Sequence, residues 1–247
     1  MKYHCNAYGI PYSVIDGALI GCRSKPAKNA FLQLPHGRME RMVDSVFRHD
    51  TRNLHRFAAS DRDDRYWNVF EVDPYLSADT AYQWMNRNEE PHLNPFKEKD
   101  DRSLPARRSS KIDHYITVRN YFEGKEHYFQ NNIGANSNCQ AYLEDDTLRI
   151  QIGAWYGLGG EGFFIYQSGA RFLSMPYYYD DVIDYREPEP RNIPLWQKLV
   201  LDKATYSIGD SLYGYISFGS VFYNKYGTPS GNKANGFFRT VIKKRDW

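Results

Sequence analysis

The stretch 199–243, LVLDKATYSIGDSLYGYISFGSVFYNKYGTPSGNKANGFFRTVIK, carries the clearest structural signal in the chain. Residues 212–218 alternate between two faces, and residues 237–243 do the same. A period of two predicts strands with one buried face. The faces expected to be buried consist of Leu212, Gly214, Ile216 and Phe218 in the first strand, and Phe238, Thr240 and Ile242 in the second.

Turn residues separate these strands. Gly209 and Asp210 follow Tyr206, and this combination is typical of a turn because glycine reaches unusual backbone angles and aspartate bonds nearby amides. The segment from Asn224 to Asn235 holds two glycines and a proline, which predicts a long connecting loop. Short strands of this kind, rich in tyrosine and phenylalanine, predict an antiparallel sandwich.

One pattern within this stretch resembles a known type of domain. The residues Leu201-Asp-Lys203, Tyr206, Gly209-Asp210, Leu212 and Gly214 are similar to the first hairpin of macroglobulin-type, immunoglobulin-like β-sandwich domains. The resemblance covers roughly 20 residues. It implies a fold and no catalysis, because such modules are usually structural or adhesive.

A longer run, from Cys139 to Lys243, resembles a family of uncharacterised, β-rich bacterial proteins. The resemblance implies a fold and a bacterial origin, with no activity attached. The matching residues are Asp146-Thr-Leu148, Ile150, Ile152-Gly153, Gly160, Gly162-Phe163, Ile165, Tyr177, Asp181-Val-Ile183, Gln197-Lys-Leu199 and Gly209-Asp-Ser-Leu-Tyr-Gly214.

The N-terminal part differs from the rest of the chain. Two amphipathic stripes, within 39–47 and 77–85, predict two helices. Residues 97–111 are rich in charge and follow a segment with two prolines, which predicts a charged linker or loop, and residues 112–247 are predicted to form strands. The predicted fold class is therefore α+β, with two N-terminal helices followed by an antiparallel β-rich region that ends in an immunoglobulin-like sandwich. Its expected parts are a mixed region 1–96, the charged segment 97–111 and the sandwich region 112–247, unless 1–96 and 112–247 form one continuous domain.

Composition narrows the classes of function. A net charge of +2 argues against a strongly basic nucleic-acid binder, so we expect no nucleic-acid partner. The three cysteines are far apart and form no CxxC pair, which argues against a zinc ribbon or a redox motif. No stretch approaches the roughly 20 apolar residues of a membrane helix. We expect a soluble protein, cytoplasmic or periplasmic.

No motif predicts a catalytic, metal or cofactor site. The glycine-rich segment 156–162 is followed by strand-like residues, whereas a phosphate-binding loop needs a helix there, so a hairpin is expected. The histidines form no metal-binding spacing, although His114 and His127 could face each other on neighbouring strands. We therefore expect no catalytic residue, metal or cofactor; a site assembled only in space stays open.

The most unusual surface-type segment combines aromatic rings with carboxylates. Its members, expected to form a partner-binding surface, are Tyr177, Tyr178, Tyr179, Asp180, Asp181 and Asp184. Rings provide contact area and carboxylates steer a basic partner, so the first hypothesis is a non-catalytic bacterial protein-binding module, such as an immunity-type inhibitor of a basic toxin. The alternative is a cell-envelope protein that binds or acts on carbohydrate, since rings beside polar groups also suit a glycan. Ordinary strand residues with half-buried rings would give the same pattern.

Overall fold

The computed structural model describes residues 66–89, 107–123, 125–134, 137–155, 159–180, 191–224 and 228–244. All of them belong to one of the two units into which the chain divides, Val43–Trp247. The described strands are β1 (Asn68–Val69), β2 (Glu71–Val72), β3 (Ser110–Phe122), β4 (Lys125–Asn132), β5 (Asn138–Glu144), β6 (Thr147–Trp155), β7 (Gly159–Ser168), β8 (Arg171–Asp180), β9 (Arg191–Leu201), β10 (Ser211–Tyr223) and β11 (Pro229–Lys244).

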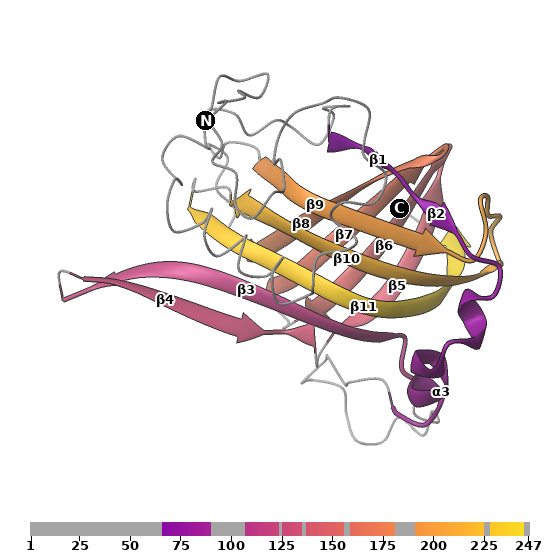
Figure 1. The fold of residues 1–247 in the computed structure, drawn as a ribbon, viewed down its shortest axis with the longest axis horizontal. Coiled ribbons are helices and arrows are strands. Elements are labelled where there is room, and N and C mark those ends of the chain that lie inside the picture. Colours follow the sequence, from indigo (N-terminus) through magenta and orange to yellow (C-terminus); the bar gives the residue numbers. More distant parts are fainter. Residues whose placement is uncertain are drawn as a thin grey trace, which may run out of the picture. The chain divides into compact units, whose positions relative to one another are not determined.

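These strands form one sheet, in the order β1-β8-β7-β6-β5-β11-β10-β9-β2. Strand β11 joins its two halves. One edge of β11 pairs with β10 along nearly its whole length; the other edge pairs first with β3, over Ser230–Phe238, and then with β5, over Ile242–Lys244. Strand β4 pairs with β3, and this hairpin extends away from the other strands (Figure 1).

The sheet curves until β8 approaches β9, so that the two halves face each other (Figure 1). In the described residues, side chains connect these two strands where backbone pairing does not. Gln197 Oε1 of β9 accepts hydrogen bonds from the Ser174 backbone N–H of β8, at 2.9 Å, and from Ser174 Oγ, at 2.8 Å. The result is a nearly closed, barrel-like sheet whose seam runs between β8 and β9.

The predicted fold class is therefore wrong. The described residues form mostly strands with a single α-helix, and the strands make one continuous sheet instead of an immunoglobulin-like sandwich. The error arose in β11. Residues 229–235, predicted to be part of a loop, are strand residues that pair with β10 and, from Ser230, with β3. Backbone pairing on both sides outweighs the weak strand preference of proline, glycine and asparagine.

Of the two predicted helices, the second is present and short. The 3-10 turn η2 (Leu76–Ala78) precedes the helix α3 (Thr80–Asn86), and the Asp79 side chain caps the helix by accepting a hydrogen bond from the Ala81 N–H. Tyr82 and Met85 of α3 are buried against the outer face of β10 and β11. The first predicted helix, within 39–47, lies outside the described residues. No helix in the described part of the chain has the length and apolar character needed to span a membrane.

The main core fills the space between the two halves of the sheet. Phe218, Phe238 and Ile242 are almost completely buried, which confirms the faces predicted from alternation. They meet apolar residues of the opposite half, including Ile150 and Ile165. The hairpin predicted at the glycine-rich segment is confirmed, because β6, which ends at Trp155, pairs in antiparallel fashion with β7, which begins at Gly159 within the segment.

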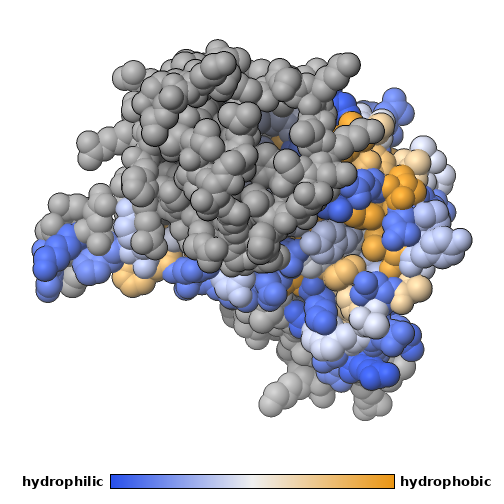
Figure 2. Space-filling model, in the orientation of Figure 1, coloured by the Kyte–Doolittle hydropathy of each residue, from blue (hydrophilic) through white to orange (hydrophobic). Residues whose placement is uncertain are grey.

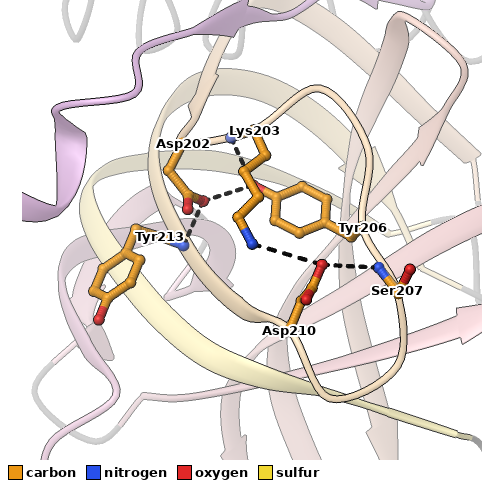
Figure 3. A network of polar contacts seen from close by, with 6 residues as sticks. All are labelled: Asp202, Lys203, Tyr206, Ser207, Asp210 and Tyr213. Atoms are coloured by element: carbon orange, nitrogen blue, oxygen red, sulfur yellow. Dashed lines mark hydrogen bonds and ion pairs between the residues drawn. The ribbon is translucent and has the colours of Figure 1, made fainter.

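The turn motif that resembles a sandwich hairpin has a structural explanation (Figure 3). Asp202 Oδ1 accepts hydrogen bonds from the Tyr206 hydroxyl, at 2.7 Å, and from the Tyr213 backbone N–H, at 2.9 Å. Asp210 accepts a bond from the Ser207 N–H and lies 3.6 Å from Lys203 Nζ. Burial and the bond to Asp202 raise the pKa of Tyr206, so its hydroxyl stays protonated. These contacts hold the turn between β9 and β10.

Candidate functional site

The predicted partner-binding segment lies at the end of β8. Tyr177 and Tyr178 are adjacent in this strand, so they point to opposite faces of the sheet. Tyr179 and Asp180 end the strand, and their side chains are not described; Asp181 and Asp184 lie outside the described residues. The structure thus places two of the six predicted residues in detail and separates them onto two faces.

Tyr177 lies on the outer face, where it takes part in a row of aromatic side chains. Its ring stacks on Phe164 with centroids 4.6 Å apart, and its hydroxyl accepts a hydrogen bond from Gln151 Nε2 at 3.3 Å. Any side chain at residue 153 would collide with the Tyr177 hydroxyl, so the glycine at this position makes room for the tyrosine. The ring of Tyr177 is therefore held in place by contacts at its face and at its hydroxyl.

We call the partly exposed side chains Arg149, Phe164, Tyr166 and Tyr177 the aromatic row. The guanidinium of Arg149 lies 4.3 Å from the centroid of the Phe164 ring, and Tyr166 lies 5.8 Å from the same ring. Arg149 also reaches Glu144, at 3.8 Å. The row crosses β6, β7 and β8 and leaves ring surface and one cation accessible on the outside of the sheet.

Apolar side chains elsewhere on the surface are scattered. On the face drawn in Figure 2, hydrophobic and hydrophilic side chains are intermixed over the part of the molecule that carries β1 and β2. Val69, Val72 and Tyr75 of this part are exposed. Single exposed apolar residues are normal on soluble domains, so this region is a weaker candidate than the aromatic row.

A second unusual feature lies inside the sheet. Five buried polar side chains follow one another across the inner faces of β3, β11, β10, β9 and β8, and we call them the polar belt. Ser220 is directly opposite Asn232 in the pairing of β10 with β11. All five are less than 7% exposed: His114, Asn232, Ser220, Asn192 and Ser174.

Only some of the polar atoms in the belt have hydrogen-bond partners within the protein. His114 Nε2 lies 3.3 Å from Asn232 Oδ1, and Asn192 Nδ2 donates to the Ser174 carbonyl oxygen at 3.0 Å. Three other atoms of the belt have no hydrogen-bond partner: His114 Nδ1, Ser220 Oγ and Asn192 Oδ1. Buried polar atoms nearly always have partners, so three such atoms within one belt call for an explanation.

The environment of His114 fixes its charge. Its ring packs edge-on against Phe163, with centroids 5.2 Å apart, and lies 6.2 Å from Phe218. Burial lowers the pKa of His114 from its ordinary value of 6.5 to about 4, and the bond with Asn232 opposes this shift only in part. The imidazole is neutral at pH 7. Because Nε2 faces the amide oxygen of Asn232, we assign the proton to Nε2, which leaves Nδ1 as an acceptor.

Sequence reasoning missed the polar belt. His114 and His127, which the sequence left free to face each other, do not do so: His127 pairs with Asn120, whereas His114 pairs with Ala234 of β11. A signal was available at Ser220: it continues the inward alternation of Ile216 and Phe218 and is the first polar residue on that face. The contribution of β11 could not be found, because Asn232 was assigned to a loop.

Within the described residues, no group of three or more His, Cys, Asp or Glu side chains is placed to hold a metal ion. Comparisons with protein-family models, with curated proteins and with solved structures return no match. The two features above, the aromatic row outside and the polar belt inside, are therefore interpreted from their own chemistry.

Proposed function

We propose that this protein acts by binding a protein partner on the outer face of β6, β7 and β8, through the aromatic row. The observation that supports this is the stacked, partly exposed arrangement of Phe164 and Tyr177 beside the Arg149 guanidinium. Protein interfaces are enriched in tyrosine, phenylalanine and arginine, and tyrosine and arginine are among the residue types that supply most of the binding energy.

The rigidity of the row supports the same function. Tyr177 is held by its stacking on Phe164 and by the bond from Gln151, so a partner would not have to order a mobile ring. Binding usually costs about 0.5–1.5 kcal/mol for each flexible side chain that becomes fixed. A preorganised ring avoids part of that cost.

We propose a positively charged partner because acidic residues occur at the end of β8 and just after it in the sequence. Asp180, Asp181 and Asp184 follow Tyr177 closely in the sequence, so this segment of the chain is acidic. A basic protein, such as a toxin inhibited by this chain, would be attracted by them. Replacing the three aspartates with lysine should then slow association with little effect on the stability of the fold.

The test compares Tyr177, which is partly exposed in the row, with Tyr75, which is exposed outside it. The tagged protein captures its partner from a lysate of its native cell, and mass spectrometry identifies what binds in stoichiometric amount. Tyr177→Ala should weaken binding roughly 30-fold, the effect of about 2 kcal/mol at a central interface residue. Tyr75→Ala is the matched control, because Tyr75 is 83% exposed and lies outside the row. Partner binding that survives Tyr177→Ala, with both variants folded, would contradict the proposal.

A glycan partner is the second candidate, and the position of the Gln151 amide favours it. This amide donates to the Tyr177 hydroxyl at the edge of the stacked rings, which is the combination of flat ring and polar group that sugars use. A glycan array on which wild type binds and Tyr177→Ala does not, together with no co-purified protein, would replace the protein partner by a carbohydrate.

A further inference from the structure

We propose that the polar belt inside the barrel-like sheet is a binding site for a small neutral molecule that carries an aromatic or aliphatic body and at least two hydrogen-bond donors. The site is separate from the aromatic row, so the proposal does not depend on the proposed function. It rests on the three unpartnered atoms of the belt, their neighbours and their place in the sheet.

The unpartnered atoms define the polar part of the ligand. Asn192 Oδ1 is an acceptor, since the amide nitrogen of the same side chain already donates to Ser174. His114 Nδ1 is an acceptor in the assigned tautomer, and Ser220 Oγ can accept or donate. Two acceptors and a hydroxyl are matched by a ligand with two or more O–H or N–H groups.

The neighbours of the belt define the rest of the ligand. His114 packs against Phe163 and Phe218, and these two rings contact each other with centroids 4.9 Å apart. Phe222, next to Ser220 on the inward row of β10, is also buried. All five side chains of the belt are uncharged at pH 7, so a charged ligand would lose its hydration without gaining an opposite charge. An apolar body with neutral polar groups fits these surroundings.

The belt ends at the seam of the sheet. Ser174, on β8, and Asn192, on β9, are joined across the seam by a side-chain hydrogen bond. The inward row of β8 then continues through buried Pro176 to Tyr178, which is 50% exposed. At the other end of the seam, β1 pairs with β8 and β2 pairs with β9, so this segment joins the two strands there. Near Ser174 and Asn192, the described parts of β8 and β9 are joined by side-chain bonds without backbone pairing, and a local opening at this end is the proposed route for a ligand.

The test uses three named probes with two donors on a neutral aromatic ring: resorcinol, 3-hydroxybenzyl alcohol and 3-hydroxybenzamide. Their donorless counterpart is 1,3-dimethoxybenzene. Binding to the full-length chain is followed by calorimetry and by the nitrogen chemical shifts of the His114 imidazole. We expect at least one of the three to bind saturably at millimolar concentration and to shift His114 Nδ1, and the dimethoxy compound to do neither.

Two buried serines provide the matched variants. Ser220→Ala removes an unpartnered hydroxyl of the belt, and Ser110→Ala removes a hydroxyl that already donates to the Ser137 carbonyl oxygen at 2.5 Å. Probe affinity should fall roughly fivefold in Ser220→Ala, the effect of one hydrogen bond, and stay unchanged in Ser110→Ala. Failure of all three probes to bind or to shift His114 would overturn the proposal and assign the three atoms to ordered water. Equal binding of 1,3-dimethoxybenzene would overturn it too, because the donors would then play no part.

Discussion

The inner faces of β10 and β11 change character along their length. At one end, Leu212 and Ile216 of β10 belong to the same apolar core cluster as Phe238 and Ile242 of β11. At the other end, the same rows continue as Ser220 and Asn232, equally buried. The pairing of β10 with β11 is continuous through both ends, and both ends are buried, so burial alone does not explain the difference. We infer that the apolar end supplies the stability of the fold and that the polar end is kept for binding.

The largest effect should come from the apolar end. Phe238→Ala should lower the free energy of unfolding by about 3–5 kcal/mol, the usual cost of emptying a buried phenylalanine site. The site is tightly filled, because a side chain at Gly214 would collide with the Phe238 ring. Denaturant unfolding measures the loss. Val241→Ala, on the same strand at a residue that is 50% exposed, should change the value by less than about 0.5 kcal/mol. Equal effects would mean that the inward and outward rows are assigned backwards.

The second-largest effect should appear when the pH is lowered, because His114 lies at the polar end. The unfolded chain takes up a proton on His114 near pH 6.5, but the folded chain does so only near pH 4. The free energy of unfolding should therefore fall as the pH drops from 6.5 to 4, by about 3 kcal/mol, and level off below. His114→Gln carries no such proton and is the control. Identical pH profiles for the two proteins would show that His114 is not buried as a neutral group.

A smaller loss of stability is expected from a change in the hydrogen-bonded turn between β9 and β10. Tyr206→Phe removes the hydroxyl that donates to Asp202 at 2.7 Å, so the free energy of unfolding should fall by about 1–2 kcal/mol. Tyr75→Phe, at an exposed residue, should have no measurable effect. Thermal unfolding of the three proteins makes the comparison. If Tyr206→Phe matches wild type, the network in Figure 3 does not stabilise the turn.

Local rules predicted the strands well and their assembly poorly. Alternation identified the buried faces around Phe218 and Phe238, and the turn at Gly209 followed from glycine, whose φ here is +92°. The nearly closed sheet depends on β11, which pairs on both edges in a region whose composition resembles a loop. Pairing of this kind joins residues far apart in the sequence, and local preference carries no information about it.

The candidate site shows the same limit. The tyrosines at the end of β8 were found as a group, but their separation onto two faces followed only once the strand was placed. Tyr177 gains its neighbours Phe164 and Gln151 from two other strands. The polar belt draws one residue from each of five strands, so none of its members has a local signature except the inward position of Ser220.

The most direct test of the division between the two ends compares two buried serines. Ser110→Ala removes a hydrogen-bonded hydroxyl and should lower the free energy of unfolding by about 1 kcal/mol. Ser220→Ala removes a hydroxyl without a partner and should leave that free energy unchanged or raise it, because a buried group that costs stability is lost. Denaturant unfolding of both variants and of wild type measures these free energies. A loss in Ser220→Ala as large as that in Ser110→Ala would show that the polar belt stabilises the fold, contrary to this account.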